Sequence, residues 1–162
     1  MQPGMIIVGM ADLNVAASPG ILTTIGLGSC VGVALYDGVK KIAGLAHIML
    51  PDSKLIKNNS NAAKFADTAI VKLLGDMARI GARPEFVKAK IAGGAQMFAF
   101  DSTSDAMRIG DKNVEATRKV LAGLGIPIIA ADTGATYGRT VEIHAEDGQF
   151  LIRTVGHGSR VL

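Results

Sequence analysis

The residues of this chain best suited to covalent chemistry are Cys30, its single cysteine, and the histidine His47. Both lie in the segment 24–51, TIGLGSCVGVALYDGVKKIAGLAHIMLP. A thiol becomes a strong nucleophile when a neighbouring histidine takes its proton. The reaction also needs hydrogen-bond donors for the negative oxygen of a tetrahedral intermediate. The prediction is that this segment folds so that both side chains meet.

A β-hairpin is the element predicted to bring them together. Two apolar runs flank Asp37-Gly38, which is a strong turn signal. A four-residue loop that begins at Asp37 places Cys30 directly opposite His47. A two-residue loop places Cys30 opposite Leu45, with His47 on the diagonal. Opposed Cβ atoms lie ~4.5–5.5 Å apart and diagonal ones ~7–8 Å. Either even-numbered loop puts thiol and imidazole on one face, whereas an odd-numbered loop separates them.

The residues before Cys30 add a tight turn that suits a nucleophile. The segment 26–29, GLGS, follows an apolar strand, and its glycines reach backbone conformations closed to other residues. We expect the backbone N–H groups of Gly28, Ser29 and Cys30 to hold the oxyanion. A thiol beside a histidine and such donors is expected to have a pKa below the ordinary ~8.5. A dinucleotide-binding interpretation is weak, because the third glycine is displaced to Gly32 and a strand follows it.

Both residues also have an ordinary structural interpretation. A single cysteine at the start of a strand is usually a small buried residue. A single histidine is usually a core or surface residue whose hydrogen bonds are satisfied. The shared hairpin face and the glycine turn favour catalysis, but these two observations leave both interpretations open.

Five motifs of the chain resemble those of the CheD family, the chemoreceptor glutamine deamidases. They are TTIGLGSCVGVALYD at 23–37, AGLAHIMLP at 43–51, KIAGGAQMF at 90–98, IGDKNVEA at 109–116 and DTG at 132–134. The resemblance spans nearly the whole chain and its motifs are specific. One departure is Ala135, where the family pattern leads us to expect a second glycine after DTG.

The resemblance implies a catalytic set and a reaction. Cys30 would be the nucleophile, His47 its base, and Thr24 of the T-x-G-L-G-S-C pattern the third member. The substrate would be a glutamine on a cytoplasmic helix of a chemoreceptor, hydrolysed to glutamate and ammonia without a metal or organic cofactor. A CheC-type phosphatase is the implied partner, and receptor glutamate methyl esters are a second substrate that the same site would accept. The resemblance also implies an α/β sandwich similar to that of bacterial deamidating toxins.

A function of a different class is a non-catalytic adaptor that binds the receptor or CheC, with Cys30 only a core residue.

Under the catalytic interpretation, Thr23 and Thr24 alternate along one strand, so only one of them faces the Cys30–His47 pair. The family pattern favours Thr24, whose hydroxyl is expected to bond to the His47 ring or to the substrate amide. Thr23 is expected to bond local backbone.

Composition places the chain among cytoplasmic proteins. Its 162 residues are enough for one domain with an aliphatic core, since 49% are hydrophobic and only 4% aromatic. No apolar run approaches the ~20 residues of a membrane helix, and the first residues lack the basic region of a signal peptide. The net charge is +3 with scattered basic residues, which argues against nucleic acid and favours an acidic partner. His144 and His157 lack metal-ligand spacing, so we expect no metal site.

The rest of the chain predicts a single mixed α/β domain, residues 1–162, with two helices covering a layered core of sheets. Strands are expected at 5–10, 21–25, 86–92 and 126–131, and a second hairpin at 139–144 and 149–155. Helices are expected at 112–124 and at 62–80, the latter capped by Asn59, Ser60 or Asn61.

Three segments are expected to be irregular. Residues 54–61 read as a mobile loop that borders the site as a lid, and the tail 156–162 as a frayed end. Residues 96–108 carry Met97, Phe98 and Phe100, which are either core anchors or a partner-docking patch. Asp132 either orients a catalytic group or caps a turn through backbone hydrogen bonds.

Overall fold

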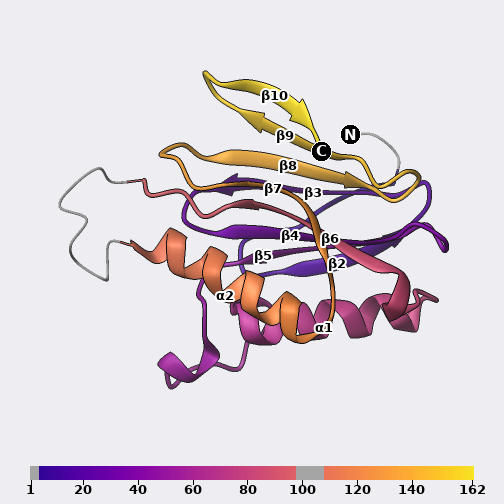
Figure 1. Ribbon diagram of the computed structural model, residues 1–162, viewed down its shortest axis with the longest axis horizontal. Helices are drawn as coiled ribbons and strands as arrows, with labels where there is room; N and C mark the ends of the chain where they lie inside the picture. Colours follow the sequence, from indigo (N-terminus) through magenta and orange to yellow (C-terminus); the bar gives the residue numbers. More distant parts are fainter. Residues whose placement is uncertain (1–3, 98–107) are drawn as a thin grey trace.

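The computed structural model describes residues 4–97 and 108–162, which form two five-stranded sheets and two α-helices (Figure 1). The first sheet has the order β1 (Met5–Ile7), β3 (Ile21–Leu27), β8 (Arg139–His144), β9 (Phe150–Thr154) and β10 (Gly158–Val161). The second has the order β2 (Leu13–Ala17), β5 (Ile42–Ile48), β4 (Val31–Asp37), β6 (Val87–Gly93) and β7 (Ile128–Thr133). The α-helices are α1 (Ala66–Arg79) and α2 (Ile109–Gly123), and the short 3-10 helices are η1 (Ser53–Leu55), η2 (Ala62–Lys64) and η3 (Pro84–Phe86).

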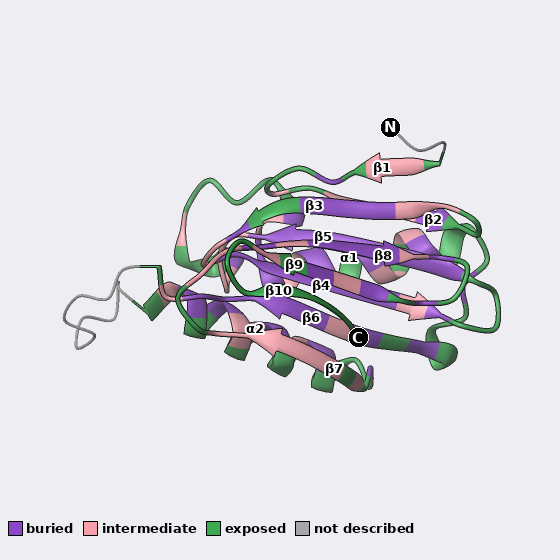
Figure 2. Ribbon diagram, turned by 90° about the horizontal axis from the view of Figure 1, so that it is seen from above, coloured by how far each residue is buried: buried purple, intermediate pink, exposed green. Residues whose placement is uncertain are grey.

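The second sheet is the middle of three layers. Figure 1 shows both helices along one side of it and the first sheet on the other. One apolar core, which includes Val33 and Ile70, lies between helices and sheet. A second core, which includes Leu22 and Leu45, lies between the two sheets. Because β4 and β5 are covered on both faces, they read as nearly continuous apolar runs and appear buried in Figure 2. The predicted mixed α/β class and its layered sheets are confirmed.

The helices differ from their predicted bounds at their first turns. Helix α1 buries one face, with Ala66, Ala69, Ile70, Leu73 and Met77 buried. The helix itself begins at Ala66, and the side chain of Asn61 caps the short η2 helix that precedes it. The predicted asparagine or serine cap on this helix is therefore wrong, because the chain pairs Leu50 with Phe65 before it becomes α-helical. Helix α2 begins at Ile109, three residues before the predicted start.

Two strands were not predicted. β2 lies at the edge of the second sheet, antiparallel to β5, in a stretch whose Asn14 reads as a turn residue. β10 pairs antiparallel with β9, so the prediction of a frayed tail is wrong. All four β10 residues are exposed. The strand is therefore held by backbone hydrogen bonds and shows no alternation of apolar residues.

Residues 98–107, including Phe98 and Phe100, lie outside the described part of the chain, and Met97 is 46% exposed.

The Cys/His hairpin forms, but in a register that neither predicted loop gives. Gly32 pairs with His47, and Asp37 pairs with Ile42 at the end of β4. The four-residue loop is therefore shifted by one position, because the Asp37 carboxylate accepts the N–H groups of Val39 and Lys40 at 2.9 and 3.0 Å. Asp37 thus remains in the strand and closes the turn with its side chain.

Candidate active site

Cys30 and His47 lie on the same side of the second sheet despite the shifted register. Cys30 precedes Gly32 by two residues, and Gly32 pairs with His47, so Cys30 is one diagonal step from the histidine. The thiol belongs to the core between the two sheets, as does Leu45, which shares its β5 face with His47. Cys30 is 8% exposed and His47 1% exposed. Moving the loop by one position moved the partner of each β4 residue by two positions along β5. The predicted shared face is preserved because this number is even.

The turn that carries Cys30 lies between β3 and β4 and rests against the end of β6. The Gly94 N–H donates to the Cys30 carbonyl at 2.8 Å, and the Ala95 N–H donates to the Gly28 carbonyl at 2.9 Å. Gly93 permits this close approach, since a Cβ there would lie 2.3 Å from the Cys30 carbonyl oxygen. Its φ of +107° also favours glycine. The glycine pair at the end of β6, Gly93 and Gly94, therefore supports the cysteine turn.

Thr24 reaches His47 from the opposite sheet. Its hydroxyl oxygen lies 2.7 Å from His47 Nδ1 and 2.6 Å from the Val8 carbonyl oxygen. The carbonyl can only accept, so the single hydroxyl hydrogen must point at Val8. The Thr24 oxygen then accepts a hydrogen bond from the Nδ1–H of His47. This fixes the neutral ring with its hydrogen on Nδ1 and a lone pair on Nε2. His47 Nε2 is buried and has no hydrogen-bond partner among the described residues. The atom that would take a thiol proton is thus in its basic form.

Thr23, the neighbour of Thr24, faces the other way as expected. Its hydroxyl donates to the Val141 carbonyl on β8 at 2.8 Å. The expected hydrogen bond between Thr24 and the His47 ring is confirmed, and the catalytic role of Thr24 stays a prediction.

Burial sets the charge state of the pair. Burial raises the pKa of the Cys30 thiol above its ordinary value, and a hydrogen bond from its own backbone N–H offsets this only in part. Burial lowers the pKa of His47 below its ordinary value of 6.5. Both shifts favour a neutral thiol and a neutral imidazole at pH 7. The expected low pKa of Cys30 is therefore wrong for the resting site, and the proton must move as the sulfur attacks.

The expected oxyanion donors are unequal. The Gly28 N–H donates to the Gly26 carbonyl at 3.0 Å, so this donor is engaged within the turn. The Ser29 N–H has no backbone acceptor in residues 4–97 and 108–162, and the Cys30 N–H interacts with its own sulfur. In a trans peptide the C=O and the next N–H point in opposite directions. The carbonyl of Gly28 is held by Ala95, two residues after the end of β6, so the Ser29 N–H points away from that segment.

Asp132 does neither of the two things expected of it. Its carboxylate forms an ion pair with the buried Arg139 at 3.0 Å, joining the end of β7 to the start of β8. The loop between them contains Ala135, whose φ is +61°, and its carbonyl accepts the Gln96 N–H at 2.9 Å. The left-handed backbone conformation costs a residue other than glycine about 1–2 kcal/mol. The glycine expected after DTG would avoid this cost.

The remaining histidines lie away from the pair. His144 Nε2 lies 2.9 Å from the Glu142 carboxylate, and the His157 ring stacks on Tyr137 with centroids 3.9 Å apart. Within the described part of the chain, no three histidine, cysteine, aspartate or glutamate side chains are grouped as metal ligands. The same part contains no helix long and apolar enough to span a membrane.

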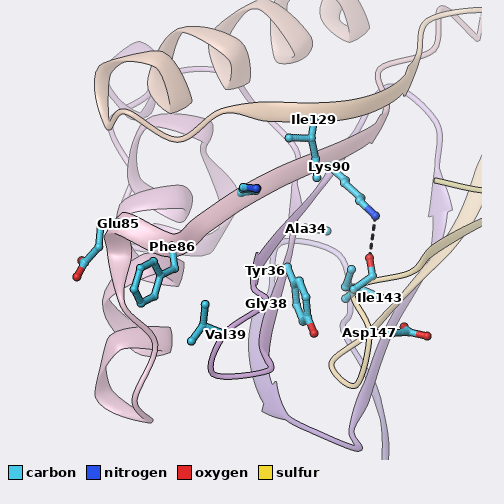
Figure 3. Close-up of a pocket in the computed structure, with 12 residues that line it drawn as sticks. Ala34, Tyr36, Gly38, Val39, Glu85, Phe86, Lys90, Ile129, Ile143 and Asp147 are labelled. Atoms are coloured by element: carbon cyan, nitrogen blue, oxygen red, sulfur yellow. Dashed lines mark hydrogen bonds between the residues drawn. The ribbon is translucent and has the colours of Figure 1, made fainter.

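A surface pocket of about 380 Å³ lies at the other end of β4 (Figure 3). Tyr36, Phe86 and Ile129 line it, and Lys90 donates to the Gly148 carbonyl at its edge. Tyr36 follows Cys30 by six residues, a distance of about 20 Å along an extended strand. This pocket therefore does not open onto the thiol.

Sequence reasoning missed Asn113, the one fully buried side chain of α2 that reaches the cysteine turn. Its amide nitrogen donates to the carbonyls of Ser29 and Met49, both at 2.9 Å. The available signal was helical spacing: Asn113, Thr117 and Leu121 recur every four residues and are all buried.

Comparison with known proteins agrees with the motifs. A family model described as CheD chemotactic sensory transduction matches residues 49–154. A crystal structure of the Bacillus licheniformis hypothetical protein YfiH matches 77% of this chain and 50% of its own, with 17% identity and a TM-score of 0.48. The chemoreceptor glutamine deamidase CheD of Halalkalibacterium halodurans is 57% identical over 154 residues, which are 94% of this chain and 95% of the relative. The probable chemoreceptor glutamine deamidase CheD of Caldanaerobacter subterraneus subsp. tengcongensis is 56% identical over 162 residues, the whole of both chains. This chain belongs to the CheD family.

Proposed function

We propose that this protein deamidates glutamine side chains of chemoreceptors to glutamate, with Cys30 as nucleophile and His47 as general base and acid. The observation that carries the proposal is the Nε2 of His47, which has no hydrogen-bond partner in residues 4–97 and 108–162, is held in its basic form by Thr24 and lies one diagonal step from the thiol. Relatives that match over the whole chain bear the name of probable chemoreceptor glutamine deamidases, and this supplies the substrate class.

The first half of the reaction forms a thioester. His47 Nε2 takes the Cys30 proton as the sulfur attacks the carboxamide carbon of the glutamine. The carbonyl oxygen becomes an oxyanion, which the N–H groups of Ser29 and Cys30 stabilise. The intermediate then collapses, the C–N bond breaks, and His47 gives its proton to the nitrogen. Ammonia leaves and the substrate carbonyl remains bonded to sulfur.

The second half restores the enzyme. His47 Nε2 takes a proton from water as the water oxygen attacks the thioester carbon. The C–S bond breaks, the proton returns to the sulfur, and glutamate leaves. Apart from the substrate and water, these steps use side-chain and backbone groups of this chain. A glutamate methyl ester would pass through a similar tetrahedral intermediate, so we propose it as a second substrate, and a CheC-type phosphatase as a partner.

Mass spectrometry of a chemoreceptor cytoplasmic fragment tests the function. Incubation with the protein is expected to add ~1 Da per converted glutamine, because –NH2 is replaced by –OH. Tandem spectra then locate the glutamates along the receptor helix. A fragment whose mass does not change, with folded protein in excess, would favour the adaptor interpretation in which Cys30 is only a core residue.

Thr24→Val tests the positioning of the imidazole. The valine keeps the shape and β-propensity of threonine but removes the acceptor that fixes the Nδ1 hydrogen. We expect the deamidation rate to fall ~10–100-fold, which is about 1.4–2.7 kcal/mol of transition-state stabilisation.

Thr23→Val is the matched control, because each variant loses one hydrogen bond from a hydroxyl to a backbone carbonyl. Thr24→Val should melt at the lower temperature of the two, because it also leaves the His47 Nδ1 hydrogen unpaired, and Thr23→Val should keep nearly the full rate. Equal rate losses in both variants would show that the hydroxyl of Thr24 acts through stability alone.

A further inference from the structure

Asn113 joins the cysteine turn to the strand that carries His47. It lies in the second turn of α2, is fully buried, and donates through one nitrogen to two backbone carbonyls. The Ser29 carbonyl is 84 residues away in sequence and the Met49 carbonyl 64 residues away. Ser29 directly precedes Cys30, and Met49 follows His47 by two residues, directly after the end of β5. One side chain therefore spans the two segments whose separation sets the thiol–imidazole geometry.

The orientation of the Asn113 amide has only one solution. Both neighbours of its nitrogen are carbonyl oxygens, so the nitrogen must face them and donate both hydrogens. The side-chain oxygen is buried without a partner among the described residues. A buried amide that leaves its oxygen unpaired bears a cost of about 1–3 kcal/mol. The Asn113 amide thus makes both hydrogen bonds through its nitrogen while its oxygen has no partner among the described residues.

Helix α2 is pressed against the same turn by a close backbone contact. A Cβ on Gly110 would lie 2.4 Å from the Ala95 carbonyl oxygen and 2.6 Å from that of Gly94. These two residues are the ones that hold the carbonyls of Gly28 and Cys30. Since Gly110 precedes Asn113 by three residues, the close approach brings the Asn113 side chain within reach of the turn.

We propose that Asn113 is a positioning residue for the reaction, an inference that rests on the proposed function. By holding the Ser29 carbonyl, it fixes the plane of the Ser29–Cys30 peptide and aims the Cys30 N–H away from α2, toward the oxyanion. A hydrogen bond to that carbonyl also polarises the peptide and strengthens its N–H as a donor. By holding Met49 at the same time, it keeps this peptide in register with His47.

The test compares Asn113→Ala and Asn113→Asp with wild type on a chemoreceptor fragment. Aspartate keeps the shape of asparagine, but as a carboxylate it has no hydrogen to donate. Loss of one oxyanion donor or a 1 Å misplacement costs on the order of 100-fold. We expect kcat to fall ~10–100-fold in both variants with KM nearly unchanged, because the peptide acts on the transition state.

Thr117→Ala is the matched control, since Thr117 is equally buried one turn further along α2 and its hydroxyl has no partner in the described residues. A second readout is alkylation of Cys30 by iodoacetamide, a displacement at carbon that develops no oxyanion. We expect alkylation to fall less than deamidation in both Asn113 variants, because it uses the thiol–imidazole geometry but no oxyanion donor. Deamidation losses equal to that of Thr117→Ala, or alkylation that falls as far as deamidation, would overturn the inference.

Failure of this inference is distinct from failure of the proposed function. If wild type converts glutamine and Cys30→Ala does not, the nucleophile is established whatever Asn113 does. If Cys30→Ala converts glutamine at the wild-type rate, the proposed site is wrong and the positioning role of Asn113 falls with it.

Discussion

Cys30→Ala is expected to abolish deamidation of a chemoreceptor fragment while the protein stays folded. The substitution removes the only thiol of the chain, so neither the tetrahedral intermediate nor the thioester can form. Loss of the nucleophile in a comparable hydrolase costs a factor of ~10⁶, so we expect the rate to fall at least ~1,000-fold. Conversion is measured as the ~1 Da mass gain per glutamine.

The folded state of this variant must be shown independently. Cys30 is nearly buried in the core between the sheets, and a typical point substitution costs about 1 kcal/mol. We therefore expect a melting temperature lowered by only a few degrees. Cys30→Ser provides a second variant that keeps the size of the side chain but replaces the thiol with a hydroxyl. Near-normal conversion by Cys30→Ala would remove Cys30 from the mechanism, whereas the serine variant, whose hydroxyl is a weaker nucleophile, should be strongly slowed.

The sequence predicted the shared face of the catalytic pair better than its register. Alternation along a strand makes the face depend only on whether the loop is even or odd, and two apolar runs around Asp37-Gly38 favoured an even loop. The register depended on a side chain: Asp37 accepts two loop amides and so stays paired with Ile42. Hydrophobic pattern does not encode such a bond, which is why both predicted pairings were wrong.

Elements held by backbone or long-range polar contacts were the ones that sequence reasoning missed. β10 has no buried residue and is defined by its ladder with β9, so no apolar pattern marks it. The Arg139–Asp132 ion pair and the contacts of Asn113 join residues that only the tertiary fold brings together. The low pKa expected of Cys30 was wrong for a similar reason. Local partners argued for a thiolate, but burial between two sheets is a property of the whole fold, and it dominates.

His47→Asn is expected to lower kcat/KM by ~100–10,000-fold at pH 7, the usual contribution of a general base. Asparagine places an amide N–H near the position of Nδ1 and so keeps a donor for Thr24, but it has no basic atom in place of Nε2. The loss therefore reports proton transfer and not the disruption of the contact between the sheets. His144→Asn is the control, because that histidine contacts Glu142 and lies away from the pair.

The pH dependence of the two proteins is expected to differ in a way that only a proton-transfer role explains. Burial lowers the pKa of His47, so wild type should keep its activity as pH falls through 6.5 and lose it only below that value, where the ring becomes protonated. His47→Asn has no such group.

Burial raises the pKa of Cys30, so in the His47→Asn variant, which lacks a base, the thiolate forms only at high pH. The rate of the variant should therefore rise about tenfold per pH unit, following the thiolate fraction, until the Cys30 thiol itself ionises. The difference between the two proteins should narrow as pH rises, because a thiolate no longer needs a base to attack. Profiles of kcat/KM from pH 5 to 10 measure this. Parallel profiles separated by a constant factor would show that His47 contributes to the fold of the site without accepting the proton of Cys30.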